Sequence, residues 1–465
     1  MRIFIILLLV LIKTKVFSQE PLSLDQFLHW VKLEHPAVKE ANQRFLQAQN
    51  LLLLAKGNFD PKLNFAMDRK KFDGNNYYTI SENQLSIPTR IGVKFKAGYD
   101  FTSGTYLNPL DIKPINGQAL LGFDLPILQG LFFDEFRLIL REAELNLNIQ
   151  KLGLDQVKND LLLDASKVYI DWYISFQQKE VQNQALILAK NRLNDMVFSY
   201  LSGDKPNIDT IEVYVNVLTR ASSLFDVSLD YQLSAQEMGN YLWRNNIPDS
   251  ADNFFPLATK ELEPEVDQNA DFWVQNTLSG NPDILILRLS GNQYQLERKW
   301  ALEQFKPNLN LQFNALANGR QFSQEFDFRS DNFLLENNYK IGLRAQIPIL
   351  FRKERGKLQL IDNKIKEWEY KILDKTQYWT TKANQYFNAF KILNEQVKNL
   401  QDQSFQLNTL FEAEKIKFDA GESSVFLLNA REQKNLEIKM KLIKTKGERL
   451  KHYYTLLWTA GQLAK

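Results

Sequence analysis

Few of the residue types that carry out chemistry in proteins are available to this chain of 465 residues. Cysteine is absent, which excludes disulfides, thiolate metal sites, cysteine nucleophiles and a lipid-modified N-terminal cysteine. The three histidines, His29, His35 and His452, do not cluster in the sequence. We find no glycine-rich phosphate loop, no metal-ligand spacing and no nucleophile motif. The sequence therefore argues against an enzyme and predicts neither a cofactor nor a metal.

The candidate functional residues that are not catalytic lie at two reversals of the chain. Gly203-Asp204 and Gly421-Glu422 each follow a long apolar-periodic segment. Glycine suits such a reversal because it readily adopts a positive φ, so both glycines also fit a simple helix cap. Asp209 and Glu212 follow the first reversal and lie three positions apart, which places both carboxylates on one helix face.

The charge balance does not point to a nucleic-acid partner. The 57 Lys and Arg residues nearly match the 55 Asp and Glu residues. A protein that binds the phosphate backbone normally has a clear basic excess. The sequence therefore predicts no binding to nucleic acid.

Residues 1–18 have the pattern of an export signal. Arg2 precedes an apolar run at 3–12, which is shorter than the roughly 20 residues of a membrane span. Val16-Phe17-Ser18 then suits signal cleavage, although the start of a buried helix is the alternative. No later stretch approaches about 18 uncharged apolar residues. The sequence thus predicts an exported protein that is either soluble outside the cytoplasm or a β-barrel.

An internal repeat organises the rest of the chain. The same offset separates Pro36 from Pro282 and Pro61 from Pro307, which bound a helical segment in each half. Further segments recur in the same order: Leu63-Asn64-Phe65 as Leu309-Asn310-Leu311, Pro126-Ile127-Leu128 as Pro348-Ile349-Leu350, Tyr200-Leu201-Ser202-Gly203 as Phe418-Asp419-Ala420-Gly421, and Tyr241-Leu242-Trp243 as Leu456-Leu457-Trp458. Matches in this order indicate a duplicated unit.

Each repeat is predicted to contain a helix, strands, a very long helix, a turn and a return helix. Repeat 1 covers 19–244 and repeat 2 covers 281–465, with a connector at 245–280 between them. The predicted elements are strands at 61–126, a long helix at 128–200 and a return helix at 207–243, then strands at 307–348, a long helix at 353–418 and a return helix at 424–460. The connector is acidic and contains three prolines, and either a strap around the helices or a solvated linker fits this composition.

The strand regions show alternating apolar and polar residues. Leu63, Phe65 and Met67 alternate with polar neighbours, and 93–101, 309–313 and 339–347 do the same. About ten residues suit a tilted membrane strand, but half-buried strands of a soluble sheet alternate in the same way. Residues 73–117 form an extra stretch in the first repeat, which we interpret as a surface loop or an additional hairpin.

The predicted long helices are too long for a compact globule. About 70 residues give about 105 Å of helix, several times the thickness of a bilayer core. Apolar seams with heptad-like spacing favour coiled-coil packing, so such helices form a rod or a tube wall. The polar residues that interrupt the seams would then face a water-filled lumen.

The strand count predicts that several copies are needed. The chain holds about four to six membrane-length strands, whereas an ordinary barrel needs about eight. An open sheet in lipid leaves edge N–H and C=O groups unpaired, at several kcal/mol each. Three copies of four strands would give about twelve. The predicted fold is a mixed α+β membrane protein with a long α-helical barrel continuous with a transmembrane β-barrel, closed by a homotrimer.

The duplicated segments and the two turns resemble the TolC-like family of outer membrane efflux proteins, from about Leu22 to Leu463. This resemblance implies a homotrimer with a twelve-stranded barrel, an α-helical barrel and an equatorial collar. It implies docking to a periplasmic adaptor and to an inner-membrane pump of the RND or ABC type. The expected place is the outer membrane of a Gram-negative bacterium, extending into the periplasm. The expected function is a passive duct for efflux or type I secretion, and the alternative is an exported trimeric coiled-coil structural protein or adhesin.

The resemblance also assigns roles to the reversals. Gly203, Asp204, Gly421 and Glu422 would form the periplasmic tip and the adaptor-docking surface. Family members often carry a ring of acidic residues six and nine positions after the second glycine.

This chain departs from that acidic pattern. It has Leu427 and Ala430 at those positions, with only Asn429 nearby, whereas Asp209 and Glu212 occupy the same spacing after the first glycine. We hypothesise that Asp209, Glu212 and Asn429 line a periplasmic constriction, where three-fold repetition would make a cation-selective ring. The alternative is that the acids only favour a helix N-terminus.

Aromatic residues near the predicted strand ends are candidates for membrane-interface girdles. They are Phe72, Tyr77, Tyr78, Tyr99, Phe101, Phe333 and Tyr339. The alternative is core packing in a soluble sheet.

Overall fold

The computed structural model describes residues 20–257, 266, 269–318 and 338–464. The predicted export signal and Phe333 lie outside the described residues. The chain divides into two compact units. The helical unit comprises Met1–Gln43, Leu152–Leu285 and Asp374–Lys465, and the sheet unit comprises Arg44–Lys151 and Ile286–Leu373.

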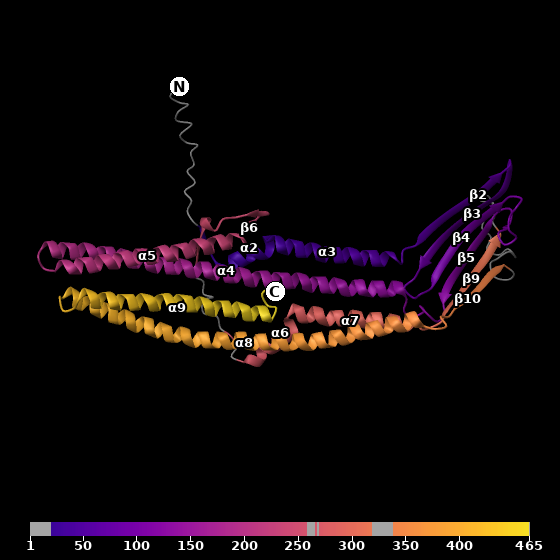
Figure 1. Ribbon diagram of the computed structural model, residues 1–465. Coiled ribbons are helices and arrows are strands. Elements are labelled where there is room, and N and C mark those ends of the chain that lie inside the picture. Colours follow the sequence, from indigo (N-terminus) through magenta and orange to yellow (C-terminus); the bar gives the residue numbers. More distant parts are fainter. Residues whose placement is uncertain (1–19, 258–265, 267–268, 319–337, 465) are drawn as a thin grey trace, which may run out of the picture. The chain divides into compact units, whose positions relative to one another are not determined.

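The sheet unit contains one antiparallel sheet of six strands (Figure 1). Its strands, in sheet order, are β10 (Tyr339–Gln346), β9 (Asn308–Asn318), β5 (Gln118–Pro126), β4 (Lys94–Ser103), β3 (Asn75–Pro88) and β2 (Lys62–Phe72). The β5–β9 pairing joins the two halves of the chain in a single sheet. The extra stretch at 73–117 therefore contributes two strands, β3 and β4, and is more than a surface loop.

The two faces of this sheet differ sharply in polarity. One row of cross-strand partners is apolar on every strand: Leu63, Leu85, Ala97, Leu121, Ala315 and Tyr339. The adjacent row on the other face is polar or glycine: Lys62, Ser86, Lys96, Gly122, Asn314 and Lys340. On the inner strands the apolar face is the more exposed one, since Leu121 is 56% exposed, whereas Ser86 and Asn314 on the other face are 4% and 7% exposed.

The helices of the two halves have matching lengths. In order they are α2 (Leu24–Glu34), α3 (Pro36–Gly57), α4 (Glu135–Leu201) and α5 (Asn207–Gly239), then α6 (Ala270–Gly280), α7 (Pro282–Glu303), α8 (Arg352–Asp419) and α9 (Val425–Thr459). The pairs measure 11 and 11, 22 and 22, 67 and 68, and 33 and 35 residues. None of the described helices combines the length and the apolar character that crossing a bilayer requires.

Each half turns in the same way between its first two helices. Pro36 and Pro282 open α3 and α7 because the fixed φ of proline suits the first helical position and its missing N–H is not needed there. The residue before each proline bonds the following helix: His35 Nδ1 accepts from Ala37 N at 3.2 Å, and Asn281 Oδ1 accepts from Asp283 N at 2.9 Å.

The predicted connector at 245–280 contains a helix, α6, at its C-terminal end. Asn269 caps this helix by accepting from Asp271 N at 2.9 Å. Trp273 and Thr277 are buried and four positions apart, so they lie on one helix face. The acidic composition of the connector concealed this apolar face.

Short segments lie just before the connector and in its described N-terminal part, up to residue 257. They are β6 (Trp243–Arg244), β7 (Ile247–Pro248), the 3-10 turn η1 (Ala251–Asn253) and β8 (Phe254–Pro256), which pairs in parallel with β1 (Glu20–Leu22). Asn245 and Asn246 both adopt positive φ, at 51° and 65°, which permits the tight turn between β6 and β7.

The first long helix begins later than the predicted position 128. Gly130 adopts a positive φ of 86°, and Asp134 Oδ1 accepts from Arg137 N at 2.8 Å, so a capped turn precedes α4. The return helix α5 ends at Gly239, where 243 was predicted, because the β6–β7 hairpin takes up Trp243.

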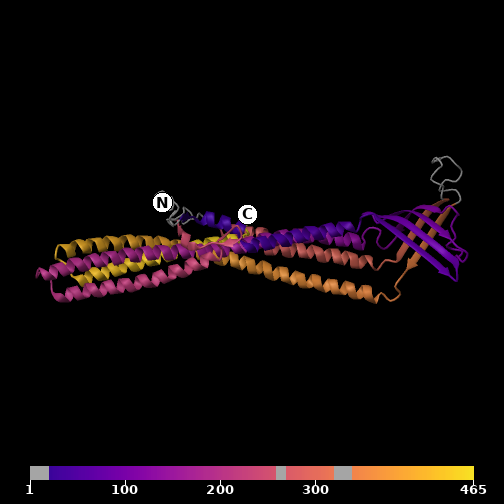
Figure 2. The same ribbon diagram turned by 90° about the horizontal axis from the view of Figure 1, so that it is seen from above.

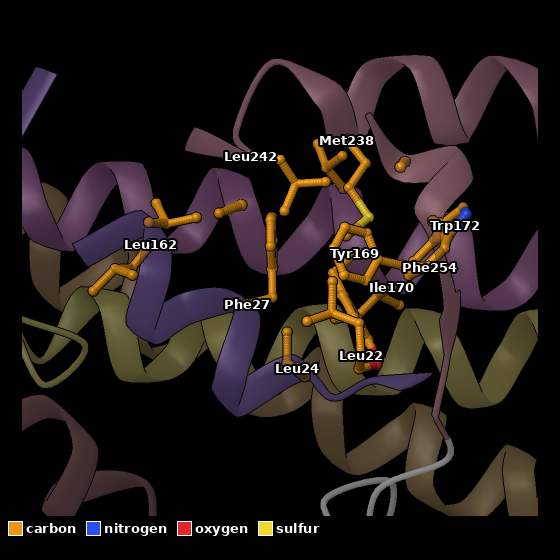
Figure 3. Packing of buried hydrophobic residues seen from close by; sticks show 14 of the residues in the cluster. Leu22, Leu24, Phe27, Leu162, Tyr169, Ile170, Trp172, Met238, Leu242 and Phe254 are labelled. Atoms are coloured by element: carbon orange, nitrogen blue, oxygen red, sulfur yellow. The ribbon is translucent and has the colours of Figure 1, made fainter. Parts of the chain in front are cut away.

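The core of the helical unit gathers segments from several parts of the chain (Figure 3). Phe27 of α2 is fully buried and stacks on Tyr169 of α4, with ring centroids 5.7 Å apart. Tyr169 donates its hydroxyl to Leu22 O at 2.7 Å. Trp172, Met238 and Leu242 complete the same cluster. Burial of these side chains fixes the N-terminal segment on α4.

Replacing Phe27 with alanine should destabilise this cluster. The lost burial and the cavity should lower the free energy of unfolding by about 3–5 kcal/mol. Denaturant unfolding followed by tryptophan fluorescence measures this change. Leu33→Ala on the same helix is the control, since Leu33 is 55% exposed. An equal effect of the two substitutions would show that Phe27 does not hold the core.

Candidate functional site at the hairpin ends

The two hairpin ends, where α4 joins α5 and α8 joins α9, share one backbone geometry. Gly203 and Gly421 have φ of 83° and 78°. Asp204 N donates to Ser199 O and Glu422 N donates to Lys417 O, both at 2.9 Å. This is the bonding pattern of a helix that ends on a left-handed glycine. No other atom lies near the place of a side chain at either glycine, so there is room for one. Glycine is required here because the backbone adopts a positive φ.

The return helices begin differently at the two ends. Ser424 caps α9 by accepting from Leu427 N at 3.2 Å. Pro206 precedes α5 and provides no side-chain cap, but Asp209 lies in the first turn of α5. A carboxylate at this position interacts favourably with the helix dipole. Asp209 can therefore stabilise the start of α5 whether or not it lines a lumen.

The two hairpins pack side by side within the helical unit (Figure 2). Met196 of α4, Val213 of α5 and Val425 of α9 form a small buried cluster next to Phe418 of α8. Lys205 Nζ lies 5.8 Å from the centre of the Phe418 ring. Each hairpin thus steadies the turn of the other, and the polar turn residues remain at the surface.

A polar cluster, here named the Arg–Glu cluster, lies next to this apolar contact, and only its members Arg220 and Glu432 are fully buried. It consists of Arg192 of α4, Arg220 of α5, and Asn429, Glu432 and Gln433 of α9. Arg192 Nη1 donates to Glu432 Oε2 at 2.6 Å and to Asn429 Oδ1 at 3.1 Å. Arg220 Nη1 donates to Gln433 Oε1 at 2.6 Å.

The Arg–Glu cluster holds one cation and one anion away from water and a second cation, Arg192, only partly exposed, at 13% of its side chain. Glu432 is 3% exposed and Arg220 is 4% exposed. Burial lowers the pKa of Arg220, whereas the nearby Glu432 carboxylate acts to raise it. Because a guanidinium stays protonated at neutral pH, both arginines depend on the one carboxylate. The cluster therefore links the first hairpin to the second electrostatically.

Sequence reasoning missed the Arg–Glu cluster, although a signal was present. Val213, Val217 and Arg220 are the buried positions of one α5 face, at spacings of four and three. Leu428 and Glu432 likewise continue the buried stripe of α9. A charged residue at a seam position, where apolar side chains are expected, indicates that a polar partner lies opposite it on the facing helix.

The predicted constriction residues are not gathered at one point. Asn429 points its amide oxygen at Arg192, as part of the contact between hairpins. Asp209 and Glu212 are half-buried on α5. Within the described parts of the chain, no hydrogen bond or ion pair joins Asn429 to either acid. Asp209 and Glu212 as lumen residues stay a prediction.

The described girdle aromatics do not form one row across the sheet. The rings of Phe72 and Tyr77 meet edge to face across the β2–β3 turn, with their centroids 5.9 Å apart. The ring centroids of Tyr77 and Tyr106 are 4.7 Å apart. Tyr99, Phe101 and Tyr339 are exposed as well, but the register places Tyr99 in the row of Phe65 and Tyr339 in the row of Leu63. The register places Tyr78 on the opposite, polar face, as the cross-strand partner of Lys70.

No site for metal chemistry is evident in the described structure. Over residues 20–257, 266, 269–318 and 338–464, no group of three or more His, Asp or Glu side chains is placed to hold an ion. The pKa shifts of His35 and His452 are explained by their burial. Burial lowers the pKa of His35 and of His452, so each favours its neutral form at neutral pH.

The sequence matches no protein-family model and no curated protein. Solved structures of outer membrane channels do match. The chain is 12% identical to the CmeC outer membrane channel of Campylobacter jejuni, with a TM-score of 0.63 over 94% of this chain and 85% of that one. It is 13% identical to the outer membrane protein VceC of Vibrio cholerae, with a TM-score of 0.61 over 94% and 96%.

A third similar structure is the open state of the MtrE outer membrane channel of Neisseria gonorrhoeae. It is 11% identical, with a TM-score of 0.63 over 95% of this chain and 89% of that one. The predicted TolC-like fold is thereby confirmed. At this level of identity the likeness concerns the fold.

Replacing Glu432 with glutamine should destabilise the contact between hairpins. The change leaves Arg192 and Arg220 buried with no anion, and breaking a buried ion pair in this way costs about 3–5 kcal/mol. Denaturant unfolding of the purified protein measures the loss. The control is Glu437→Gln on the same helix, because the Lys434–Glu437 pair is 58% and 59% exposed and should contribute little to stability. Equal losses would refute the special role of the Arg–Glu cluster.

Proposed function

We propose that three copies of this chain form an export duct that crosses the outer membrane of a Gram-negative bacterium and reaches into the periplasm. The sheet unit would form the membrane part, and the long helices would form the periplasmic tube. The duct would be passive and would open or close at the hairpin ends. It would serve a tripartite efflux system or a type I secretion system.

The observation that carries this proposal is the exposed apolar face of the sheet. A soluble sheet turns its apolar face toward a core and its polar face toward water. Here Leu63, Phe65 and Ile341 are 77%, 71% and 62% exposed on one face. An exposed apolar surface of this extent marks an interaction with lipid or with another protein. Alternation along tilted strands of this length is the pattern of a membrane barrel.

The two open edges of the sheet support closure by further copies. In the described sheet, β2 and β10 each pair with only one neighbour. Unpaired backbone groups cost several kcal/mol each in lipid, so a membrane sheet must close. Six strands fall below the roughly eight of the smallest ordinary barrels, which favours closure between chains over closure within one.

The hairpin ends supply a docking surface for other proteins. Gly203, Asp204, Gly421 and Glu422 are all exposed at the two turns. A 67-residue helix such as α4 is about 100 Å long, enough to hold its end far from a membrane. A periplasmic adaptor would bind these turns, and an inner-membrane pump of the RND or ABC type would provide the energy.

The alternative, an exported coiled-coil structural protein or adhesin, accounts for the helices alone. It gives no reason for a six-stranded sheet whose apolar side is exposed, or for its two unpaired edges. The similar solved structures are channels, which also favours the duct.

The duct predicts two properties of the purified protein. It should be recovered from the outer-membrane fraction as trimers that dissociate on heating, and it should conduct ions in planar bilayers. Monomers that stay in solution without detergent, or trimers that never conduct, would contradict the duct.

Neutralising the two acids on α5 should change ion selectivity. If three copies place Asp209 and Glu212 in a ring, Asp209→Asn/Glu212→Gln channels should lose cation preference because the ring loses its charge. Reversal potentials in a salt gradient measure the preference. Asp230→Asn, an exposed acid farther along α5, is the control and should leave selectivity unchanged. An unchanged cation preference in the double variant would remove Asp209 and Glu212 from the constriction.

A further inference from the structure

The two halves of the chain contribute unequal numbers of strands to the sheet. In the second half, β9 pairs directly with β10. In the first half, β2 and β5 occupy the corresponding places in the sequence, since Leu63-Asn64-Phe65 matches Leu309-Asn310-Leu311 and Pro126 matches Pro348. The β3–β4 hairpin stands between β2 and β5, and separates them in the sheet.

The inserted hairpin belongs to the wall of the sheet. β3 pairs with β2 from Lys62↔Ser86 to Phe72↔Asn75, with one irregularity after Lys70. β4 pairs with β5 from Lys94↔Asp124 to Asp100↔Gln118. The hairpin is thus bonded on both sides, to β2 and to β5. A loop folded over a finished four-stranded sheet would not show these ladders.

The polarity of the hairpin continues that of its neighbours. On the apolar face, Leu85, Ile87 and Phe95 are 36%, 36% and 47% exposed. On the other face, Lys96 forms an ion pair with Asp124 of β5. A one-residue slip would exchange the two faces, so the matched alternation fixes the register. Whatever medium faces β2 and β10 therefore also faces β3 and β4.

We propose that each copy contributes all six strands to the membrane wall, so that three copies enclose an eighteen-stranded barrel instead of the twelve strands first expected. This inference rests on the proposed trimeric duct. Its partner surface is the pair of edges β2 and β10, each occupied by the opposite edge of a second copy.

The strand directions suit this closure. Each step across the sheet from β10 to β2 is antiparallel, so β2 and β10 run in opposite directions. When β2 of one copy meets β10 of the next, the new pair is also antiparallel. Repeating the sheet three times thus gives a closed, all-antiparallel ring with an even number of strands, as outer-membrane barrels require.

The wider ring has a functional consequence. Barrels of about 16–18 strands leave a water-filled channel, whereas the smallest barrels are filled by side chains. The face that would line this channel carries both signs of charge, from Lys62 and Lys340 to Asp124. The outlet in the membrane would therefore be wide and wet, and restriction of passage would fall to the hairpin ends.

Fluorescent labels test the placement of the inserted hairpin. Because the chain has no cysteine, Leu85→Cys and Gln84→Cys each offer a single thiol for a bimane label. In trimers reconstituted into phosphatidylcholine vesicles, doxyl-labelled lipid should quench bimane at 85, and it should quench bimane at 84 far less. Phe65→Cys and Asn64→Cys on β2 form the reference pair and should show the same contrast.

Cross-linking tests the edge contact between copies. Asn64→Cys is combined in turn with Lys340→Cys, Gly342→Cys and Arg344→Cys, which samples the register on the polar face. One combination should give disulfide-linked trimers in the membrane, and each single variant should give none.

The outcomes separate this inference from the proposed function. Intact trimers with equal quenching at 84 and 85 would overturn the eighteen-stranded barrel, as would trimers that no edge pair cross-links. Stable dimers, which would close twelve strands from two copies, would overturn it too. Absence of any membrane oligomer would instead overturn the duct itself.

Discussion

The pairing of backbone groups at the edges of one sheet is the constraint on which the rest depends. Among the described residues, the sheet exposes its apolar face and gives β2 and β10 only one strand partner each. In water such a surface would aggregate, and in lipid the open edges would cost several kcal/mol for each unpaired group. In the proposed duct, strands of further copies would pair the open edges and lipid would cover the apolar face. The proposed assembly thus answers the hydrogen-bonding needs of the peptide group, and the proposed waterway depends on that assembly.

At the hairpin ends a different interaction sets the structure. The helices need no lipid there, and apolar contacts alone would let the two hairpins slide along their seams. The Arg–Glu cluster adds direction, because Glu432 must face Arg192 and stay close to Arg220. Buried ionic groups add little net stability but can fix one register among several. The same cluster that joins the hairpins thus specifies how their ends are aligned.

Much of the fold could be predicted from periodicity. The alternation of Leu63, Phe65 and Met67, the heptad-like seams and the repeated prolines locate strands and helices because each pattern reflects one repeating geometry. The helix α6 escaped prediction because acidic residues and prolines dominate the connector before it, whereas α6 itself carries a single acid, Asp271. The capped turn before α4 escaped because it depends on the positive φ of Gly130. Neither feature produces a periodic pattern in the sequence, so a search for periodicity cannot find it.

The candidate site was less predictable. The turn glycines were evident, since a helix that reverses requires a left-handed residue. The partner of Asn429 was not, because Arg192 lies in another helix and far away in the sequence. The number of strands per copy was likewise open until the register showed β3 and β4 between β2 and β5.

The most direct measurement of the central claim is electron cryo-microscopy of the protein in lipid nanodiscs. The account predicts three copies whose sheets close one ring within the lipid, with Leu63 and Ile341 facing the acyl chains. Single copies outside the lipid, each with an open sheet, would contradict it.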